Sequence, residues 1–478
     1  MKNPELSRRH FLKGLGTAAA TAVLGRFVFL PAGCSKETAK EAAFSNKLPV
    51  PPLLNNTSSD PNKVSFELTA QKGTTQFFKG KTTPTFGYNG GFLGPVLRVK
   101  KGQEVNVRVK NLLDEETTVH WHGALIPGEM DGGPHQIITA GGEWNPHFTI
   151  DQQAATLWYH PHPLGKTGPQ VYKGLAGLLI IDDDVSQNLN IPKDYGKNDI
   201  PLIVQDRRFA EDGSLRYMDA PDDDLHGMMG DTILVNGRVS PVLEVGTVKM
   251  RFRILNGSNA RIYDFSLSNS GKFSQIASDA GFLESPVGMD TVRLSPAERA
   301  EIIVDFSGYP VGETFSLQSG ELKIMDFVVK EKAADTTSIP AQLTSLSKIN
   351  PSTAVKTRSF RFTGGRDKAG INGLQMNPAK GMDTIHETVK LGDTEIWEMT
   401  DNTGLPHPFH IHGVHFQVLE RNGQPPPANE LGWKDTVLVD NSEKVRLIAT
   451  FGKKGIFMFH CHNLEHEDAG MMLQYEAK

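Results

Sequence analysis

The residues best able to do chemistry in this 478-residue chain are its histidines, because ten of the 16 lie in four short clusters. The clusters are HWHG (His120, His122), HPHP (His160, His162), HPFHIHG (His407, His410, His412) and HCHNLEH (His460, His462, His466). Residues two apart on a strand project to the same face, so each His-x-His pair can present two imidazoles to one metal or to two adjacent metals. Imidazole is a ligand for copper, zinc, iron and nickel, so the clusters predict metal binding.

Strands of alternating polarity must position these clusters, and one such segment recurs along the chain. In EVNVRVK, Val105, Val107 and Val109 alternate with polar residues, and VKMRFRIL alternates in the same way, while GDTEIWEMTDN is less regular. Each segment begins at a glycine and reaches an asparagine nine or ten residues later, with starts 144 and 146 residues apart, at Gly102, Gly246 and Gly392. The alternative is that these three segments resemble one another by chance. We interpret the repeat as an all-β fold of three Greek-key sandwich or barrel units.

Polar linkers rich in Pro, Asn, Ser and Thr near residues 186–199 and 334–355 separate the three units. We therefore predict a first unit at 45–190, a middle unit at 195–335 and a third unit at 350–478. Matching histidine pairs lie 290 or 300 residues apart in the first and third units: His120 and His122 before His410 and His412, and His160 and His162 before His460 and His462. The equivalent segment of the middle unit, LNGSNARIYDF, has no histidine. We expect the first and third units to dock around a metal cluster, with the middle unit maintaining the geometry.

The third unit also has ligand types that the first unit lacks. His407, Cys461 and His466 correspond by the same offsets to Thr117, Pro161 and Lys166. Two histidines, a thiolate and a weak axial methionine describe a blue-copper electron-transfer site. Met471, ten residues after Cys461 and five after His466, is chosen as the axial ligand over Met472. Zinc could use the same residues, but it has no redox chemistry.

The position of Cys461 between two histidines indicates how the two sites communicate. On a strand, Cys461 points to one face while His460 and His462 point to the other. The thiolate can hold one metal while its neighbours hold metals of the interface cluster. A short covalent path then joins an electron-accepting site to a multi-metal site.

From about residue 48 to the end, these four motifs resemble those of multicopper oxidases, especially bacterial three-domain laccase-like enzymes and periplasmic copper oxidases. The resemblance implies three cupredoxin domains and four coppers, which reduce dioxygen to water with electrons taken singly from a reducing substrate. It implies a type 1 copper on His407, Cys461, His466 and Met471, a type 2 copper on His120 and His410, and a type 3 pair on His122, His160, His162, His412, His460 and His462.

The resemblance further implies that Asp131 and Glu467 deliver protons, a role for which carboxylates are suited. The alternative for Asp131 is a turn-forming aspartate before Gly132, and the alternative for Glu467 is a solvated loop acid. The remaining histidines are expected to pack or to lie at the surface: His10, His135, His147, His226, His386 and His415.

The N-terminus indicates export. Paired Arg8 and Arg9 in SRRHFLKG precede an apolar run of small residues, which is typical of a twin-arginine leader, so we assign residues 1–44 to a leader and tether. An ordinary first helix is the alternative. LPAGC ends at Cys34 and partly matches a lipoprotein processing site, although Pro31 departs from the motif. We expect the protein in the periplasm or at the cell surface, with a lipid anchor at Cys34 left open. Without the leader, Cys461 has no cysteine partner in its chain.

Three functions follow. The first is a laccase-like oxidase of phenols, aromatic amines or metal ions, expected to be a monomer; a net charge of −5 argues against a nucleic-acid partner. The second is a cuprous oxidase, although residues 365–392 hold only Met376 and Met382 where such enzymes carry a methionine-rich insert. A soft site in LHGMMG, at His226, Met228 and Met229, is a further possibility. The third is a non-enzymatic division or scaffold protein, or a copper store, which the complete ligand set disfavours.

Overall fold

The computed structural model describes residues 46–364, 369–376, 382 and 384–478. Strands dominate these residues, which confirms the all-β fold class. Every sheet takes its strands from one of the three predicted units, although the exact unit boundaries stay a prediction. The predicted export leader and Cys34 lie outside the described residues.

The first unit has two sheets, with strand orders β2-β1-β4-β6 (β7 also pairs with β4) and β3-β9-β8-β5. Val105, Val107 and Val109 of β4 are buried, as their alternation predicts. The elements are β1 (Lys63–Phe78), β2 (Lys81–Tyr88), β3 (Leu97–Lys100), β4 (Glu104–Asn111), β5 (His120–His122), η1 (Gly128–Met130), β6 (Glu143–Trp144), β7 (His147–Thr149), β8 (Ala155–His160), α2 (Thr167–Lys173), β9 (Gly177–Asp182) and α3 (Asp184–Asn188).

The middle unit has sheets of order β13-β12-β10-β15-β20-β17-β18 (β11 pairs with β10) and β14-β22-β21-β16-β19. The polar face of β15 is buried, because Arg251 and Arg253 form ion pairs with Asp199 and Glu301. The elements are β10 (Asp199–Phe209), β11 (Leu215–Arg216), α4 (Asp223–His226), β12 (Thr232–Val235), β13 (Arg238–Val239), β14 (Val242–Gly246), β15 (Lys249–Asn256), β16 (Tyr263–Leu267), β17 (Phe273–Ser278), β18 (Gly281–Met289), β19 (Thr291–Leu294), β20 (Arg299–Asp305), β21 (Thr314–Ser319) and β22 (Leu322–Glu331).

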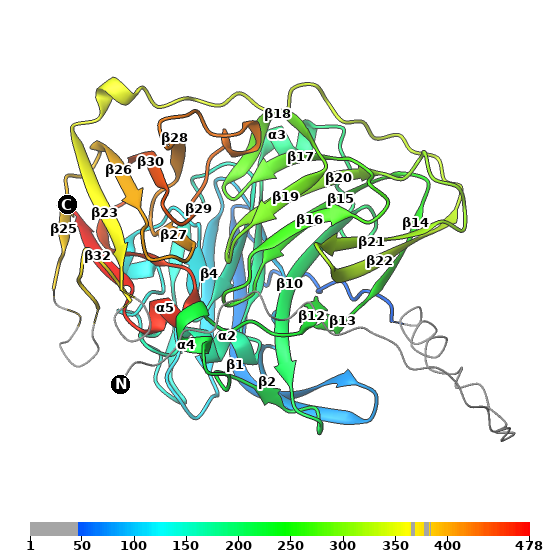
Figure 1. The fold of residues 1–478 in the computed structure, drawn as a ribbon, viewed down its shortest axis with the longest axis horizontal. Helices are drawn as coiled ribbons and strands as arrows, with labels where there is room; N and C mark the ends of the chain where they lie inside the picture. Colours follow the sequence, from blue (N-terminus) through cyan, green and yellow to red (C-terminus); the bar gives the residue numbers. More distant parts are fainter. Residues whose placement is uncertain (1–45, 365–368, 377–381, 383) are drawn as a thin grey trace, which may run out of the picture. The chain divides into compact units, whose positions relative to one another are not determined.

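The third unit has sheets of order β24-β23-β26-β30-β28 and β25-β32-β31-β27-β29. Its elements are η2 (Pro351–Thr353), β23 (Lys356–Thr363), β24 (Gly370–Ile371), β25 (Glu387–Val389), β26 (Thr394–Thr400), β27 (His407–Ile411), β28 (Phe416–Arg421), η5 (Ala428–Glu430), β29 (Thr436–Val439), β30 (Lys444–Thr450), β31 (Gly455–Cys461), α5 (Leu464–Asp468) and β32 (Met472–Ala477). The third unit (yellow to red) and the middle unit (green) lie on opposite sides of the view in Figure 1, and β1, β2 and β4 of the first unit lie between and below them.

The three recurring segments occupy equivalent places in their sheets. The strand β4 pairs in parallel with β1, β15 with β10, and β26 with β23. In each case the partner is the first long strand of its unit. Each unit therefore uses the repeated segment in the same way, as expected for one fold used three times.

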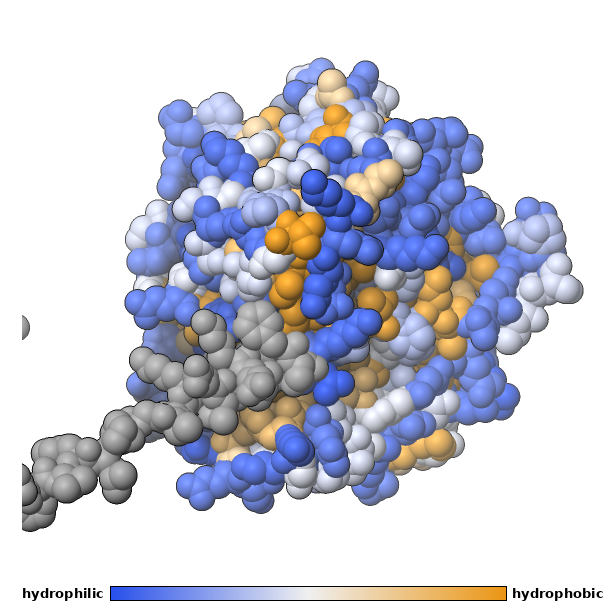
Figure 2. Space-filling view, turned by 90° about the vertical axis from the view of Figure 1, so that its right-hand side faces the viewer, coloured by the Kyte–Doolittle hydropathy of each residue, from blue (hydrophilic) through white to orange (hydrophobic). Residues whose placement is uncertain are grey.

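Figure 2 shows the face that carries β14, β21 and β22, where hydrophilic residues predominate and apolar residues appear between them in several groups. Among the described residues, every helix is too short or too polar to cross a membrane.

Candidate copper centres

The first histidine of each His-x-His pair is placed by one of two equivalent strand pairings, while His162, His412 and His462 lie just past the ends of β8, β27 and β31. In the first unit His120 lies opposite His160 across β5 and β8, and in the third unit His410 lies opposite His460 across β27 and β31. The same register in both sheets means that the equivalences predicted from the sequence spacing also hold in space.

The first and third units meet through these histidine rings. His120 stacks on His412 with ring centres 3.9 Å apart, and His122 stacks on His410 at 3.7 Å. Each of the eight rings has an exposed fraction of 1% or less. The structure therefore brings together all eight predicted residues: His120, His122, His160, His162, His410, His412, His460 and His462.

Hydrogen bonds determine which nitrogen of each ring carries the proton. His120, His160 and His410 each donate Nδ1–H to a backbone carbonyl oxygen at 2.7 to 2.9 Å. Their Nε2 atoms therefore carry a lone pair, and they have no hydrogen-bond partner within the described ranges. His122 is reversed, since Nε2 donates to Asp435 Oδ1 at 3.1 Å and leaves Nδ1 without a partner there. Such bonds are typical of histidines that bind metal through the other nitrogen.

Three further Nε2 atoms crowd together. His460 Nε2 lies 3.0 Å from His412 Nε2 and 3.2 Å from His162 Nε2. Nδ1 of His412 donates to Asp131 Oδ2 at 2.7 Å, and Nδ1 of His460 donates to the carbonyl oxygen of Cys461 at 3.1 Å. The Nε2 atoms of His412 and His460 therefore both present lone pairs, which repel at this distance unless a cation lies between them.

The donor set fits several closely spaced cations that prefer imidazole. Nitrogen atoms within 4.8 Å of one another form the groups His120–His122–His160, His120–His410–His412 and His162–His412–His460. His462 belongs to none of the tight groups found among the described residues. Burial lowers the pKa of His162 and His462 to about 3, so both rings are neutral, as metal ligands must be, at neutral pH.

A second donor group surrounds Cys461. Its Sγ lies 3.4 Å from His407 Nδ1 and 3.9 Å from His466 Nδ1. The other nitrogens are engaged, because His407 Nε2 donates to Thr403 Oγ1 at 2.8 Å and His466 Nε2 donates to the carbonyl oxygen of Leu225 at 2.9 Å. Both Nδ1 lone pairs are thus directed to the sulfur, the arrangement needed to share one metal ion.

The two candidate axial methionines occupy different surroundings. Met471 is fully buried in the same apolar cluster as Cys461. Met472 instead packs with Met376 and Met458 in a separate cluster. This placement is consistent with the choice of Met471. Burial also raises the pKa of the Cys461 thiol well above its usual range, so a bound cation is needed to hold it as a thiolate.

The middle unit contacts this second group directly. Leu225 of α4 accepts the hydrogen bond from His466, and the backbone N–H of Met228 donates to Glu465 Oε2 at 2.9 Å. Asn259 donates to Glu465 Oε1 at 2.7 Å. The middle unit therefore fixes α5, the helix that carries His466. Two members of the soft site suggested by LHGMMG differ in burial, because the exposed fraction is only 1% for Met228 but 37% for Met229.

Both predicted proton-relay acids lie against the histidine cluster. Asp131 is buried and accepts from His412, while its Oδ1 has no hydrogen-bond partner in the part of the chain described. Glu467 is 1% exposed, with Oε1 3.4 Å from His162 Nδ1 and Oε2 3.2 Å from His460 Nδ1. Glu467 is therefore not the solvated loop acid of the alternative reading, and both carboxylates retain oxygen lone pairs without a hydrogen-bond partner among the described residues.

Sequence reasoning missed the residues that anchor His122. Asp435 and Thr436 both face its Nε2, at 3.1 and 3.2 Å, and Arg299 of the middle unit is paired with Asp435. Gly123, the last residue of HWHG, has φ of +85°, and a Cβ there would lie 2.5 Å from Asp435 Oδ2. The glycine in the motif was a usable signal, whereas nothing in the sequence around Asp435 marks it.

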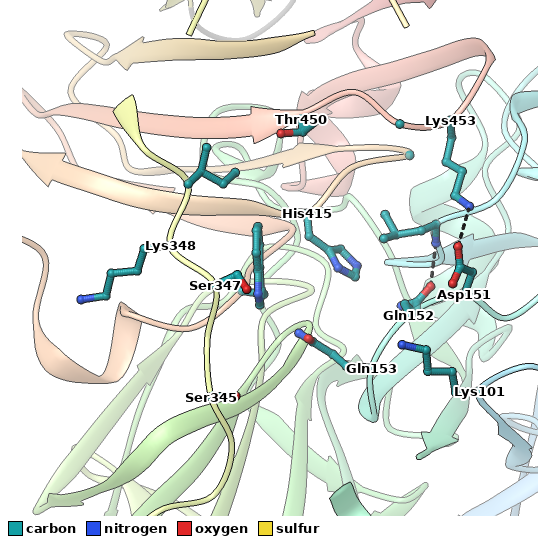
Figure 3. A pocket seen from close by; sticks show the side chains of 15 residues that line it. Lys101, Asp151, Gln152, Gln153, Ser345, Ser347, Lys348, His415, Thr450 and Lys453 are labelled. Atoms are coloured by element: carbon teal, nitrogen blue, oxygen red, sulfur yellow. Dashed lines mark hydrogen bonds and ion pairs between the residues drawn. The ribbon is translucent and has the colours of Figure 1, made fainter. Parts of the chain in front are cut away.

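A surface pocket of about 440 Å³ lies at the seam between the first and third units, and Figure 3 shows the ring of His415 pointing into it. His415 Nε2 donates to the carbonyl oxygen of Gly123 at 2.8 Å, and Gln152 Nε2 donates to the same oxygen at 3.1 Å. The pocket therefore approaches the cluster at the residue after His122. The predicted copper ligands are all among the described residues, and none of them lines this pocket.

Comparisons with known proteins agree with this geometry. Family models described as multicopper oxidase match residues 69–186 and 348–478, and a twin-arginine translocation signal model matches residues 5–25. The chain is 41% identical over 436 residues to the multicopper oxidase mco of Staphylococcus aureus, covering 90% of this chain and 92% of that protein. It is 35% identical to the cell division protein FtsP of Xenorhabdus nematophila, covering 98% and 97%. A crystal structure of laccase from Pediococcus acidilactici superposes with a TM-score of 0.86 at 40% identity, covering 90% and 93%.

This chain belongs to the multicopper oxidase family. It is accordingly an oxidoreductase with copper cofactors, which uses dioxygen and a reducing substrate. The predicted laccase-like oxidase function and cupredoxin-like fold are confirmed at this level, and the signal-sequence match confirms export.

Proposed function

We propose that this protein holds four coppers and oxidises phenolic or similar one-electron donors. The type 1 copper is assigned to His407, Cys461, His466 and Met471, and the type 2 copper to His120 and His410. The type 3 pair is assigned to His122, His160, His162, His412, His460 and His462. The observation that carries the proposal is the position of Cys461, whose sulfur faces one donor group while His460 beside it belongs to the other.

When bound, copper would supply the one-electron redox chemistry and the binding of dioxygen. The protein contributes a continuous covalent path from the Cys461 sulfur, through a single peptide bond on either side, to the imidazoles of His460 and His462. It also excludes water, because the ligands in both groups are buried. The fixed ring tautomers hold the nitrogen lone pairs in place, so that little reorganisation is needed during turnover.

Asp131 and Glu467 are proposed to supply protons for the formation of water. Each carboxylate contacts a candidate copper ligand and retains a buried oxygen lone pair that can accept and release a proton. Replacing either with its amide keeps the shape of the side chain and removes this capacity. We expect Glu467→Gln to slow oxygen consumption while copper content stays unchanged.

The decisive experiment compares the copper-loaded protein with Cys461→Ser. The parent protein is expected to show an intense blue absorption and to consume oxygen with a phenolic donor. The variant should lose both, yet keep the copper held by the eight buried histidines. An unaltered rate in the variant would refute the assignment of electron entry to Cys461.

A second candidate donor is Cu(I), and one observation favours it. Met376, Met458 and Met472 pack together, with Met382 beside them, and the backbone N–H of Met376 donates to Gly470 next to Met471. Thioethers are soft ligands that suit Cu(I). If Cu(I) is the donor, kcat/KM for Cu(I) will exceed that for a phenol by orders of magnitude, and Met376→Leu will lower the former alone.

The similarity to a cell division protein suggests a non-enzymatic alternative. The complete and buried donor set supports the oxidase instead, since a scaffold has no need of it. Oxygen consumption that depends on Cys461 distinguishes the oxidase from the non-enzymatic alternative.

We further propose a periplasmic or cell-surface location and a monomeric protein. A lipid anchor at Cys34 is testable by mass spectrometry of the mature N-terminus.

A further inference from the structure

Arg299, the first residue of β20, lies where the three units meet, and its side chain is fully buried. All five of its N–H groups donate. Nε donates to the carbonyl oxygen of Thr156 in the first unit at 3.0 Å, and Nη1 donates to Ala297 O and Asp435 Oδ1, both at 2.8 Å. Nη2 donates to Asp279 O at 2.9 Å and to Asp435 Oδ2. One side chain of the middle unit therefore bonds to all three units.

Asp435 carries this anchoring to the histidine cluster. Its Oδ1 accepts from His122 Nε2 at 3.1 Å and from Thr436 Oγ1 at 2.9 Å. Its backbone carbonyl oxygen accepts from His410 Nδ1 at 2.7 Å. The same residue thus sets the tautomer of a candidate type 3 ligand and of a candidate type 2 ligand.

Asp435 differs from the two relay acids in being saturated with hydrogen bonds. Both of its carboxylate oxygens are engaged by the Arg299 fork, whereas Asp131 Oδ1 has no donor among the described residues. A carboxylate held by a bidentate guanidinium is a fixed acceptor, and it is poorly suited to pick up protons.

We propose that Arg299 is a positioning residue for the proposed type 2 and type 3 copper sites, and that it acts by holding the Asp435 carboxylate against His122. This inference rests on the proposed assignment of the histidines as copper ligands. It explains how a middle unit without cluster histidines maintains the cluster geometry. Lysine cannot replace the arginine, because an ammonium has three donors and lacks the planar fork that grips both carboxylate oxygens.

The test is Arg299→Lys, with Arg253→Lys as its matched control. Arg253 is also buried and bidentate, through Asp199, and it bonds to Thr156 Oγ1, but its hydrogen bonds reach neither a candidate copper ligand nor Asp435 within the described residues. We expect Arg299→Lys to keep the blue absorption of the Cys461 site. Its affinity for the remaining coppers and its rate of oxygen consumption should fall by about 10- to 100-fold, the usual effect of losing a partner of a metal-bound histidine. Arg253→Lys should keep both its affinity for the remaining coppers and its rate of oxygen consumption.

Copper content, the electron paramagnetic resonance spectrum and oxygen consumption are measured together on both variants. If Arg299→Lys matches Arg253→Lys in all three, the inference is overturned while the proposed function stands. Should Arg299→Lys fail to fold, Asp435→Asn provides the second test, and normal copper content with normal oxygen consumption in that variant overturns the inference. A parent protein that lacks Cys461-dependent oxygen consumption would refute the proposed function itself.

Discussion

Replacing Gly123 with alanine tests how tightly the residues beside the histidine cluster pack around Asp435. Gly123 has φ of +85°, and a Cβ there would lie 2.5 Å from Asp435 Oδ2, 2.9 Å from Leu157 Cδ2 and 3.1 Å from Arg299 Nη2. The backbone conformation alone costs an alanine about 1–2 kcal/mol. Overpacking against a rigid buried ion pair adds roughly 1–3 kcal/mol. We therefore expect Gly123→Ala to lower the free energy of unfolding by about 2–5 kcal/mol in total and to displace Asp435 from His122.

Gly102 provides a matched control in the same unit. Its φ is +89°, and no atom of the described residues lies within 4 Å of a Cβ built there, so Gly102→Ala should cost only about 1–2 kcal/mol for the backbone conformation. Guanidinium unfolding of the metal-free variants measures the difference, and copper titration measures the effect on the site. Equal losses of stability and equal copper content in the two variants would refute the packing argument.

Two further predictions concern the metal-free protein. Burial holds the pKa of His162, His407 and His462 near 3 against 6.5 in the unfolded chain, so the unfolded state binds more protons between these values and stability falls as the pH drops from 6.5 toward 3. Each of these rings should lower the free energy of unfolding by about 1 kcal/mol when the pH falls from 7 to 5.5, which denaturant unfolding measures. The stability of the copper-loaded protein should depend much less on pH over this range. Cys461, buried and with a raised pKa, should not react with a thiol reagent until the metal-free protein is unfolded, and rapid reaction under native conditions would contradict this.

Much of the site could be predicted because its signals are local. Histidines two residues apart on a strand necessarily share a face, and the repeat spacing alone relates His120 to His410. Cys461 between two histidines likewise defines opposite faces of one strand. The same local logic places Val105 and its alternating neighbours in the core.

The residues that orient the ligands could not be predicted, because they come from distant parts of the chain. Arg299 is 136 residues from Asp435, and Leu225 is 241 residues from His466. Their sequence surroundings resemble those of any buried ion pair or short helix. The polar face of β15 shows the same limit, since its arginines are buried by partners that only the tertiary fold supplies.

The most direct measurement is anomalous diffraction at the copper absorption edge from crystals of the copper-loaded protein. We predict one peak bonded to the Cys461 sulfur and three peaks among the eight histidines between the first and third units. A peak pattern that leaves the sulfur without copper, or that places the other ions outside this interface, would contradict the account.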